Sequence, residues 1–171
     1  MLPLKDNVPT RRFPVVTVTI IAINFAVWIF GNNVEDTLGR FRFVVFYLLG
    51  GLVATALQTA VTLEMGSRAA AQVPNVGASG AIAAVLGAYI VLLPHGRVLT
   101  WVIPFFVFEL PAIAFLGIWF LLQLYLGSSS FVQPQEGGGV AFFAHIGGFV
   151  FGLLAVRIFS TGRPRPLQPA Y

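Results

Sequence analysis

The chain has 171 residues, of which 57% are hydrophobic and only 9% are charged. In soluble domains about a quarter of the residues are charged, so this composition excludes an ordinary soluble protein and predicts one that lies in a lipid bilayer. Its net charge of +4 comes from ten basic residues scattered between apolar runs, which form no patch for nucleic acid. The absence of cysteine excludes a disulfide framework, a thiolate nucleophile and a cysteine-ligated metal.

Five apolar runs predict an all-α, multi-pass membrane helical bundle in one domain. The runs cover residues 13–30, 43–63, 76–93, 98–126 and 140–159. The fourth is too long for one straight span, so we expect an interfacial piece up to about Leu110 and a span from Pro111. The domain is predicted at residues 13–159, after a cytoplasmic leader at 1–12 and before a disordered, basic and proline-rich tail at 160–171.

The distribution of basic residues does not fit a simple crossing by the first run. If that run crossed once, the two sides of the membrane would hold four and six basic residues. If both of its ends lay on one side, the split would be nine and one, with Arg68 alone on the other side. The positive-inside rule favours the second arrangement. The first run is therefore predicted to enter and return on one side, unless a neighbouring span is missing.

The third and fifth runs carry the residues that could do chemistry. Ser79 lies three residues into the third run, and His145 lies five residues into the fifth. Runs separated by one span point the same way, so at about 1.5 Å per residue the two side chains lie within roughly 3 Å of the same depth. A serine activated by a histidine base is a sufficient nucleophile pair. The alternatives are a capping or packing role for Ser79 and an interhelical hydrogen bond for His145.

Small residues would allow these two helices to approach closely. Gly148 and Gly152 on the histidine helix follow Ala144 at four-residue spacing, the pattern of tightly packed membrane helices. We expect Gly80 and Gly87 to serve the same purpose on the serine helix.

Hydrogen-bond donors for a developing oxyanion are expected just before the serine. The backbone N–H groups of Gly77 and Ala78 lie at the start of that helix, where they could face the oxyanion or simply be capped. Glu109 is expected at the opposite interface from Ser79, and His95 is interpreted as a solvated turn residue. With two histidines and no cysteine, no metal site is predicted.

These motifs resemble those of the rhomboid family of intramembrane serine proteases. Residues 77–80, GASG, are similar to the family's GxSG nucleophile motif, and residues 144–152 are similar to its AHxxGxxxG base motif. Residues 28–39 look like the end of the family's second helix and the loop after it. The resemblance implies a serine endopeptidase that cleaves transmembrane or juxtamembrane segments of membrane proteins, with Ser79 as nucleophile and His145 as base.

The same resemblance implies the setting of the protein. Its partners would be transmembrane protein substrates and the lipid bilayer, with no cofactor. We expect an integral, multi-pass protein of a bacterial-type plasma membrane. The sequence carries no signal of oligomeric state.

The chain departs from the family pattern before residue 28. Rhomboids of this kind have six spans, and the second carries a histidine and an asparagine, four residues apart, that stabilise the oxyanion. No His-xxx-Asn occurs in this sequence. We therefore expect about five apolar segments, without the first loop and most of the second helix, and Asn24 could partly replace the lost donors. The alternative is a catalytically impaired rhomboid-like pseudoprotease that binds transmembrane clients.

Overall fold

The structure is a computed structural model that describes residues 30–65, 78–102, 106–129 and 140–161. Residues 30–38 are helical, and the elements after them are α2 (Arg40–Met65), α4 (Ser79–Leu92), β1 (Arg97–Val102), β2 (Phe106–Pro111), α5 (Ala112–Ser129) and α6 (Phe142–Phe159). By length and composition, α2, α5 and α6 can each cross a membrane, and α4 is a shorter apolar helix. The prediction of an all-α, multi-pass membrane bundle is confirmed.

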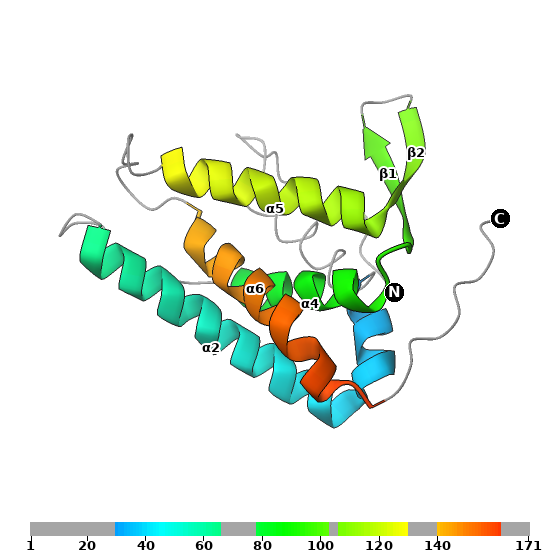
Figure 1. Ribbon diagram of the computed structural model, residues 1–171, viewed down its shortest axis with the longest axis horizontal. Helices are drawn as coiled ribbons and strands as arrows, with labels where there is room; N and C mark the ends of the chain where they lie inside the picture. Colours follow the sequence, from blue (N-terminus) through cyan, green and yellow to red (C-terminus); the bar gives the residue numbers. More distant parts are fainter. Residues whose placement is uncertain (1–29, 66–77, 103–105, 130–139, 162–171) are drawn as a thin grey trace, which may run out of the picture.

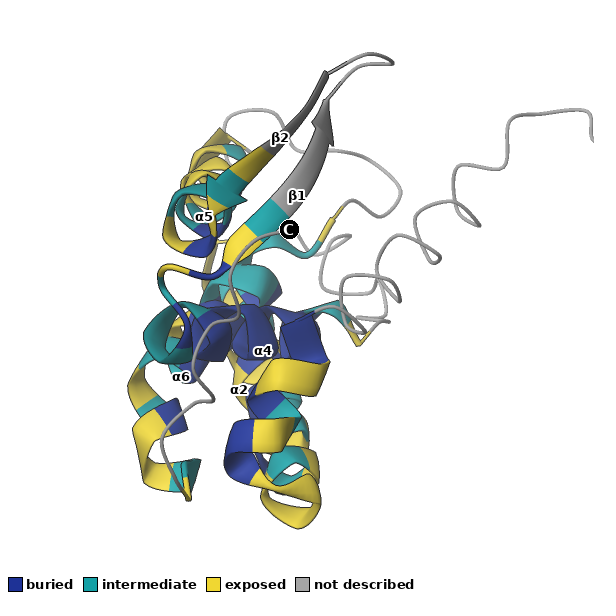
Figure 2. Cartoon of the chain, turned by 90° about the vertical axis from the view of Figure 1, so that its right-hand side faces the viewer, coloured by how far each residue is buried: buried dark blue, intermediate teal, exposed yellow. Residues whose placement is uncertain are grey.

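Helix α4 forms the centre of the bundle, and residues 80–89, ten of its 14, are buried (Figure 2). The glycines and alanines of its sequence leave little side-chain volume, so the backbones of neighbouring helices can come close. The outer faces of α2, α5 and α6 instead expose large apolar side chains such as Leu52, Leu121 and Leu154. Such faces are stable against lipid and not against water.

Contacts between small residues give the directions of the three central helices. Gly50 of α2 lies against Ala84 of α4, and Gly80 of α4 lies against Ala54 of α2, so these two helices are antiparallel. Gly148 of α6 lies against Gly80, and Gly152 lies against Ala84, so α4 and α6 are parallel. This is the relative direction that the sequence predicts for the third and fifth runs.

A two-stranded antiparallel hairpin connects α4 to α5, and the sequence did not predict it. Its register pairs Arg97 with Pro111 and Val102 with Phe106, and it projects beyond the start of α5 (Figure 1). An interfacial piece was expected here, but a short apolar run does not distinguish a strand from a helix by periodicity. The expected division at Pro111 agrees with the start of α5 at Ala112.

The turn between residues 30–38 and α2 depends on a glycine. Gly39 has a φ of 81°, and its N–H donates a hydrogen bond to the Glu35 carbonyl at 2.7 Å. A left-handed residue that closes a helix in this way is usually glycine, because a Cβ would be strained there. The first run up to residue 29, the leader at 1–12 and most of the tail lie outside the described residues.

The arginines that the structure describes gather at one end of the bundle. Arg40 and Arg42 begin α2, Arg97 follows α4, and Arg157 lies in the last turn of α6. Because α2 is antiparallel to α4 and α6, these positions share an end, and Ser79 lies at the other. The positive-inside rule favours the inner side of the membrane for the arginine end.

Candidate active site

Ser79 is the first residue of α4, and it is half-buried. The N-cap position belongs to Ala78, which makes no side-chain capping hydrogen bond, and the Ala78 carbonyl accepts the N–H of Ile82 at 3.0 Å. Ser79 is therefore the first helical residue and not the N-cap. The Ser79 hydroxyl lies at the positive end of the α4 dipole, where negative charge is stabilised.

His145 lies in the first turn of α6 and is held by two side chains of α5. Its Nδ1 lies 2.9 Å from Oε1 of Gln123, and Gln123 is only 7% exposed. Trp119, one turn earlier on α5, places its ring centroid 5.9 Å from that of the imidazole. Neither residue was predicted from the sequence. A lone glutamine in an apolar span was the available signal, because polar side chains inside a membrane usually have partners.

Backbone contact between α4 and α6 sets the level of the two candidate catalytic residues. A Cβ added to Gly80 would lie 3.4 Å from the carbonyl oxygen of Ala144 and 3.5 Å from its Cβ. Ser79 precedes Gly80 and His145 follows Ala144, so the structure places them at the same level on adjacent parallel helices. Within the described part of the chain, no hydrogen bond joins the two side chains.

Glycines maintain this close approach along the whole interface. A Cβ on Gly148 would meet the Gly80 carbonyl, a Cβ on Gly152 would meet the Ala84 carbonyl, and a Cβ on Gly87 would meet the backbone of Phe149. No larger residue fits at these positions unless the helices separate.

A side chain of α2 also holds the start of α6, in addition to the contacts from α4 and α5. Oε1 of Gln58 accepts the backbone N–H of Ala144 at 3.1 Å. Nε2 of Gln58 donates to Oγ1 of Thr62 at 3.2 Å, and this hydroxyl donates to the Gln58 carbonyl at 2.8 Å. The same Ala144 N–H also donates to the Ala141 carbonyl at 3.1 Å, so it is shared between two acceptors. Gln58 supplies one of these acceptors from a neighbouring helix, immediately before His145, and this glutamine was not predicted from the sequence.

Several expected site residues lie outside the described ranges. Asn24 and Gly77, which were expected to support the oxyanion, are among them, whereas Ala78 is described and exposed. Glu109 forms an ion pair with Arg97 at 2.9 Å on the hairpin, at the end away from Ser79. His95 is exposed in its turn. Among the residues that the structure describes, no group of histidine, aspartate and glutamate could hold a metal ion.

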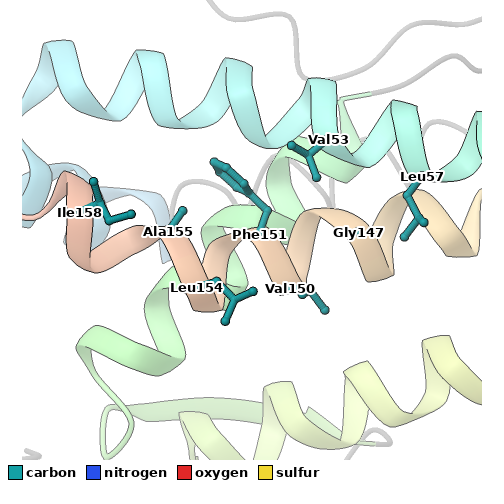
Figure 3. Close-up of a pocket in the computed structure, with 8 residues that line it drawn as sticks. All are labelled: Val53, Leu57, Gly147, Val150, Phe151, Leu154, Ala155 and Ile158. Atoms are coloured by element: carbon teal, nitrogen blue, oxygen red, sulfur yellow. The ribbon is translucent and has the colours of Figure 1, made fainter.

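An apolar groove of about 460 Å³ lies between α2 and α6 (Figure 3). Its lining residues all have apolar side chains or none: Val53, Leu57, Gly147, Val150, Phe151, Leu154, Ala155 and Ile158. A groove without a nucleophile, an acid or a hydrogen-bond donor cannot catalyse a reaction. The groove lies on the side of α6 that faces α2, whereas His145 contacts α5 on another side.

Comparison with known proteins gives one family. The model of the Rhomboid domain matches residues 16–162. Rhomboid protein 1, mitochondrial, from Saccharomyces cerevisiae is 28% identical over 129 residues, which cover 75% of this chain and 34% of the relative. Presenilin-associated rhomboid-like protein, mitochondrial, from Bos taurus is 31% identical over 84 residues, or 49% of this chain and 21% of the relative. Presenilin-associated rhomboid-like protein A, mitochondrial, from Danio rerio is 29% identical over 133 residues, which cover 75% of this chain and 30% of the relative.

The chain spans at most 34% of the length of these three relatives. Their names place them in mitochondria, which does not fit the bacterial-type plasma membrane that we expected. An integral, multi-pass membrane protein is supported by the apolar helices. No solved structure matches the chain.

Proposed function

Because the chain belongs to the rhomboid family, we propose that it is an intramembrane serine endopeptidase in which Ser79 is the nucleophile and His145 the general base. The observation that carries the proposal is the contact of Gly80 with Ala144, which sets the two residues at one level on parallel helices. In the described part of the chain the two side chains make no hydrogen bond to each other. Catalytic hydrogen bonds are often long without substrate and tighten in the complex.

The chemistry follows from the two side chains. His145 accepts the proton of the Ser79 hydroxyl as the oxygen attacks a peptide carbonyl, and then donates it to the leaving amine. Water releases the acyl group from Ser79 in a second step. Backbone N–H groups at the start of α4 stabilise the oxyanion, with Ala78 as the described candidate.

The position of the site favours a class of substrate. Ser79 and the first turn of α6 lie at the end of the bundle opposite the arginines. The substrate would be a transmembrane segment that is cut near that end. Its backbone must be locally unwound, because a membrane helix holds its carbonyls in internal hydrogen bonds.

Cleavage of a model transmembrane substrate in lipid vesicles tests the proposal. We expect Ser79→Ala and His145→Ala to abolish cleavage, and Ser79→Ala to abolish labelling by a fluorophosphonate. Matched controls are Ser128→Ala and His95→Ala, which change exposed residues of the same types and should leave cleavage unchanged. Cleavage that persists in Ser79→Ala would exclude this nucleophile.

One observation favours a second candidate function. The sequence contains no His-xxx-Asn, and loss of a single oxyanion donor lowers kcat about 100- to 1000-fold. The chain would then be a pseudoprotease that binds transmembrane clients. In the same vesicles, client capture without cleavage, equal for the wild type and Ser79→Ala, would identify this function.

A further inference from the structure

We propose that Gln123 is a positioning residue that holds His145 in the tautomer required of a base. The inference rests on the proposed protease function and adds a third side chain to the Ser79–His145 pair. It is carried by the contact between His145 Nδ1 and Gln123 Oε1 at 2.9 Å. The expected catalytic pair did not include a partner for the second ring nitrogen.

The structure places the carboxamide oxygen, and not the nitrogen, beside Nδ1, and this orientation selects the tautomer that we propose. A carboxamide oxygen has lone pairs and no hydrogen, so it can only accept. Nδ1 of His145 is therefore the donor, and a neutral imidazole with its proton on Nδ1 has its lone pair on Nε2. Nε2 is then the nitrogen that can accept a proton from Ser79.

Packing holds Gln123 in place. Trp119, Gln123 and Gly127 are spaced by four residues on α5, so they share one face of the helix. Trp119 contacts the His145 ring, and a Cβ on Gly127 would lie 3.3 Å from Cβ of Phe142. The face therefore meets α6 on both sides of Gln123, which is itself buried.

Two further ring contacts hold α5 against α6. Phe120 of α5 stacks on Phe149 of α6 with ring centroids 4.5 Å apart, and Trp119 approaches Phe149 at 5.8 Å. Rotation of α5 would break both contacts, so the carboxamide has little freedom to leave the imidazole.

A carboxamide also suits the membrane. An isolated carboxylate inside a bilayer is costly, because it has lost its hydration. The carboxamide orients the imidazole with a dipole and no net charge. The same dipole points its negative end at the imidazolium that forms when Ser79 gives up its proton.

The first test separates turnover from substrate binding. Gln123→Met keeps the length of the side chain and removes the acceptor oxygen, and we expect kcat to fall about 10- to 100-fold with KM unchanged. Gln123→Asn, whose amide is one carbon shorter, should behave in the same way. Leu121→Met is the matched control, because Leu121 faces outward from the same helix, and it should keep wild-type kcat.

The second test reads the tautomer without any activity. The chain has two histidines, so ¹⁵N labelling of histidine gives two side-chain patterns, and exposed His95 serves as the reference. We expect His145 to carry its proton on Nδ1 in the wild type and to lose this preference in both variants.

Three results would overturn the assignment: an unchanged His145 tautomer, a kcat within about twofold of the wild type in both variants, or loss of the fold in both variants, which would make Gln123 structural. A wild-type chain that neither cleaves nor reacts with the fluorophosphonate would instead contradict the proposed function. The NMR measurement still decides whether Gln123 sets the tautomer, so the two failures are distinguishable.

Discussion

Two glutamines hold the turn of α6 that carries His145. Gln123 bonds the ring, and Gln58 bonds the backbone N–H of Ala144, the preceding residue. The partner of neither could be identified from the sequence, because it depends on which helices become neighbours. Ser79 and His145 could be identified, because each lies in a local motif.

The Gln58 bond gives a stability prediction at this scale. Gln58→Leu removes one of the two acceptors of the Ala144 N–H and leaves the other, the Ala141 carbonyl, at 3.1 Å. We expect the free energy of unfolding to fall by about 0.5–1.5 kcal/mol, the net contribution of one hydrogen bond. Thr62→Val is the matched control, because it removes a hydroxyl partner of Gln58 but leaves the Ala144 bond intact. If the two variants lose the same free energy of unfolding in detergent, the hydrogen bond between Ala144 and Gln58 does not stabilise the fold more than the Gln58–Thr62 bond does, which would contradict this prediction.

Helix α4 is the element on which the site depends. Its small residues bring α6 to backbone contact, and this contact sets Ser79 and His145 at one level. The spacing of the glycines predicted such an interface, since small residues at four-residue spacing lie on one helix face. The sequence did not predict the hairpin between α4 and α5, because its apolar residues suit a strand and an interfacial helix equally.

Substitution of one glycine tests this interface. A Cβ at Gly148 would meet the Gly80 carbonyl, so Gly148→Ala must push α4 and α6 apart, at about 1–3 kcal/mol for an overpacked contact. Cleavage should fall as well, since Ser79 moves away from His145. Gly117→Ala on α5 is the control, because nothing lies within 4 Å of a Cβ there, and alanine is the better helix former. Similar melting temperatures for both variants would contradict backbone contact at Gly148.

At the scale of the whole molecule, the described arginines and the two candidate catalytic residues lie at opposite ends of the bundle. The described arginines mark one end, and Ser79 begins α4 at the other. The positive-inside rule then predicts that the bundle lies with the candidate site on the outer side of the membrane. The composition predicted a membrane protein, but the two ends could be assigned only when the helix directions were known.

Cysteine labelling tests this orientation, since the chain has no cysteine of its own. Ser128→Cys lies near the end of α5, at the Ser79 end, and His95→Cys lies beside Arg97; both positions are exposed. In intact vesicles of known orientation, a membrane-impermeant maleimide should label Ser128→Cys from the outside and His95→Cys only after the membrane is opened. Labelling of both from one side would contradict the arrangement.

The sequence by itself predicted the membrane class, the spans that correspond to α2, α4, α5 and α6, and the two candidate catalytic residues. These depend on composition and on local spacing, which a chain carries before it folds. The tertiary structure decided which side chains meet: Gln123 with His145, Gln58 with Ala144, and Gly80 with Ala144. Such pairs are distant in sequence, and they form only when packing of the apolar helices fixes which faces meet.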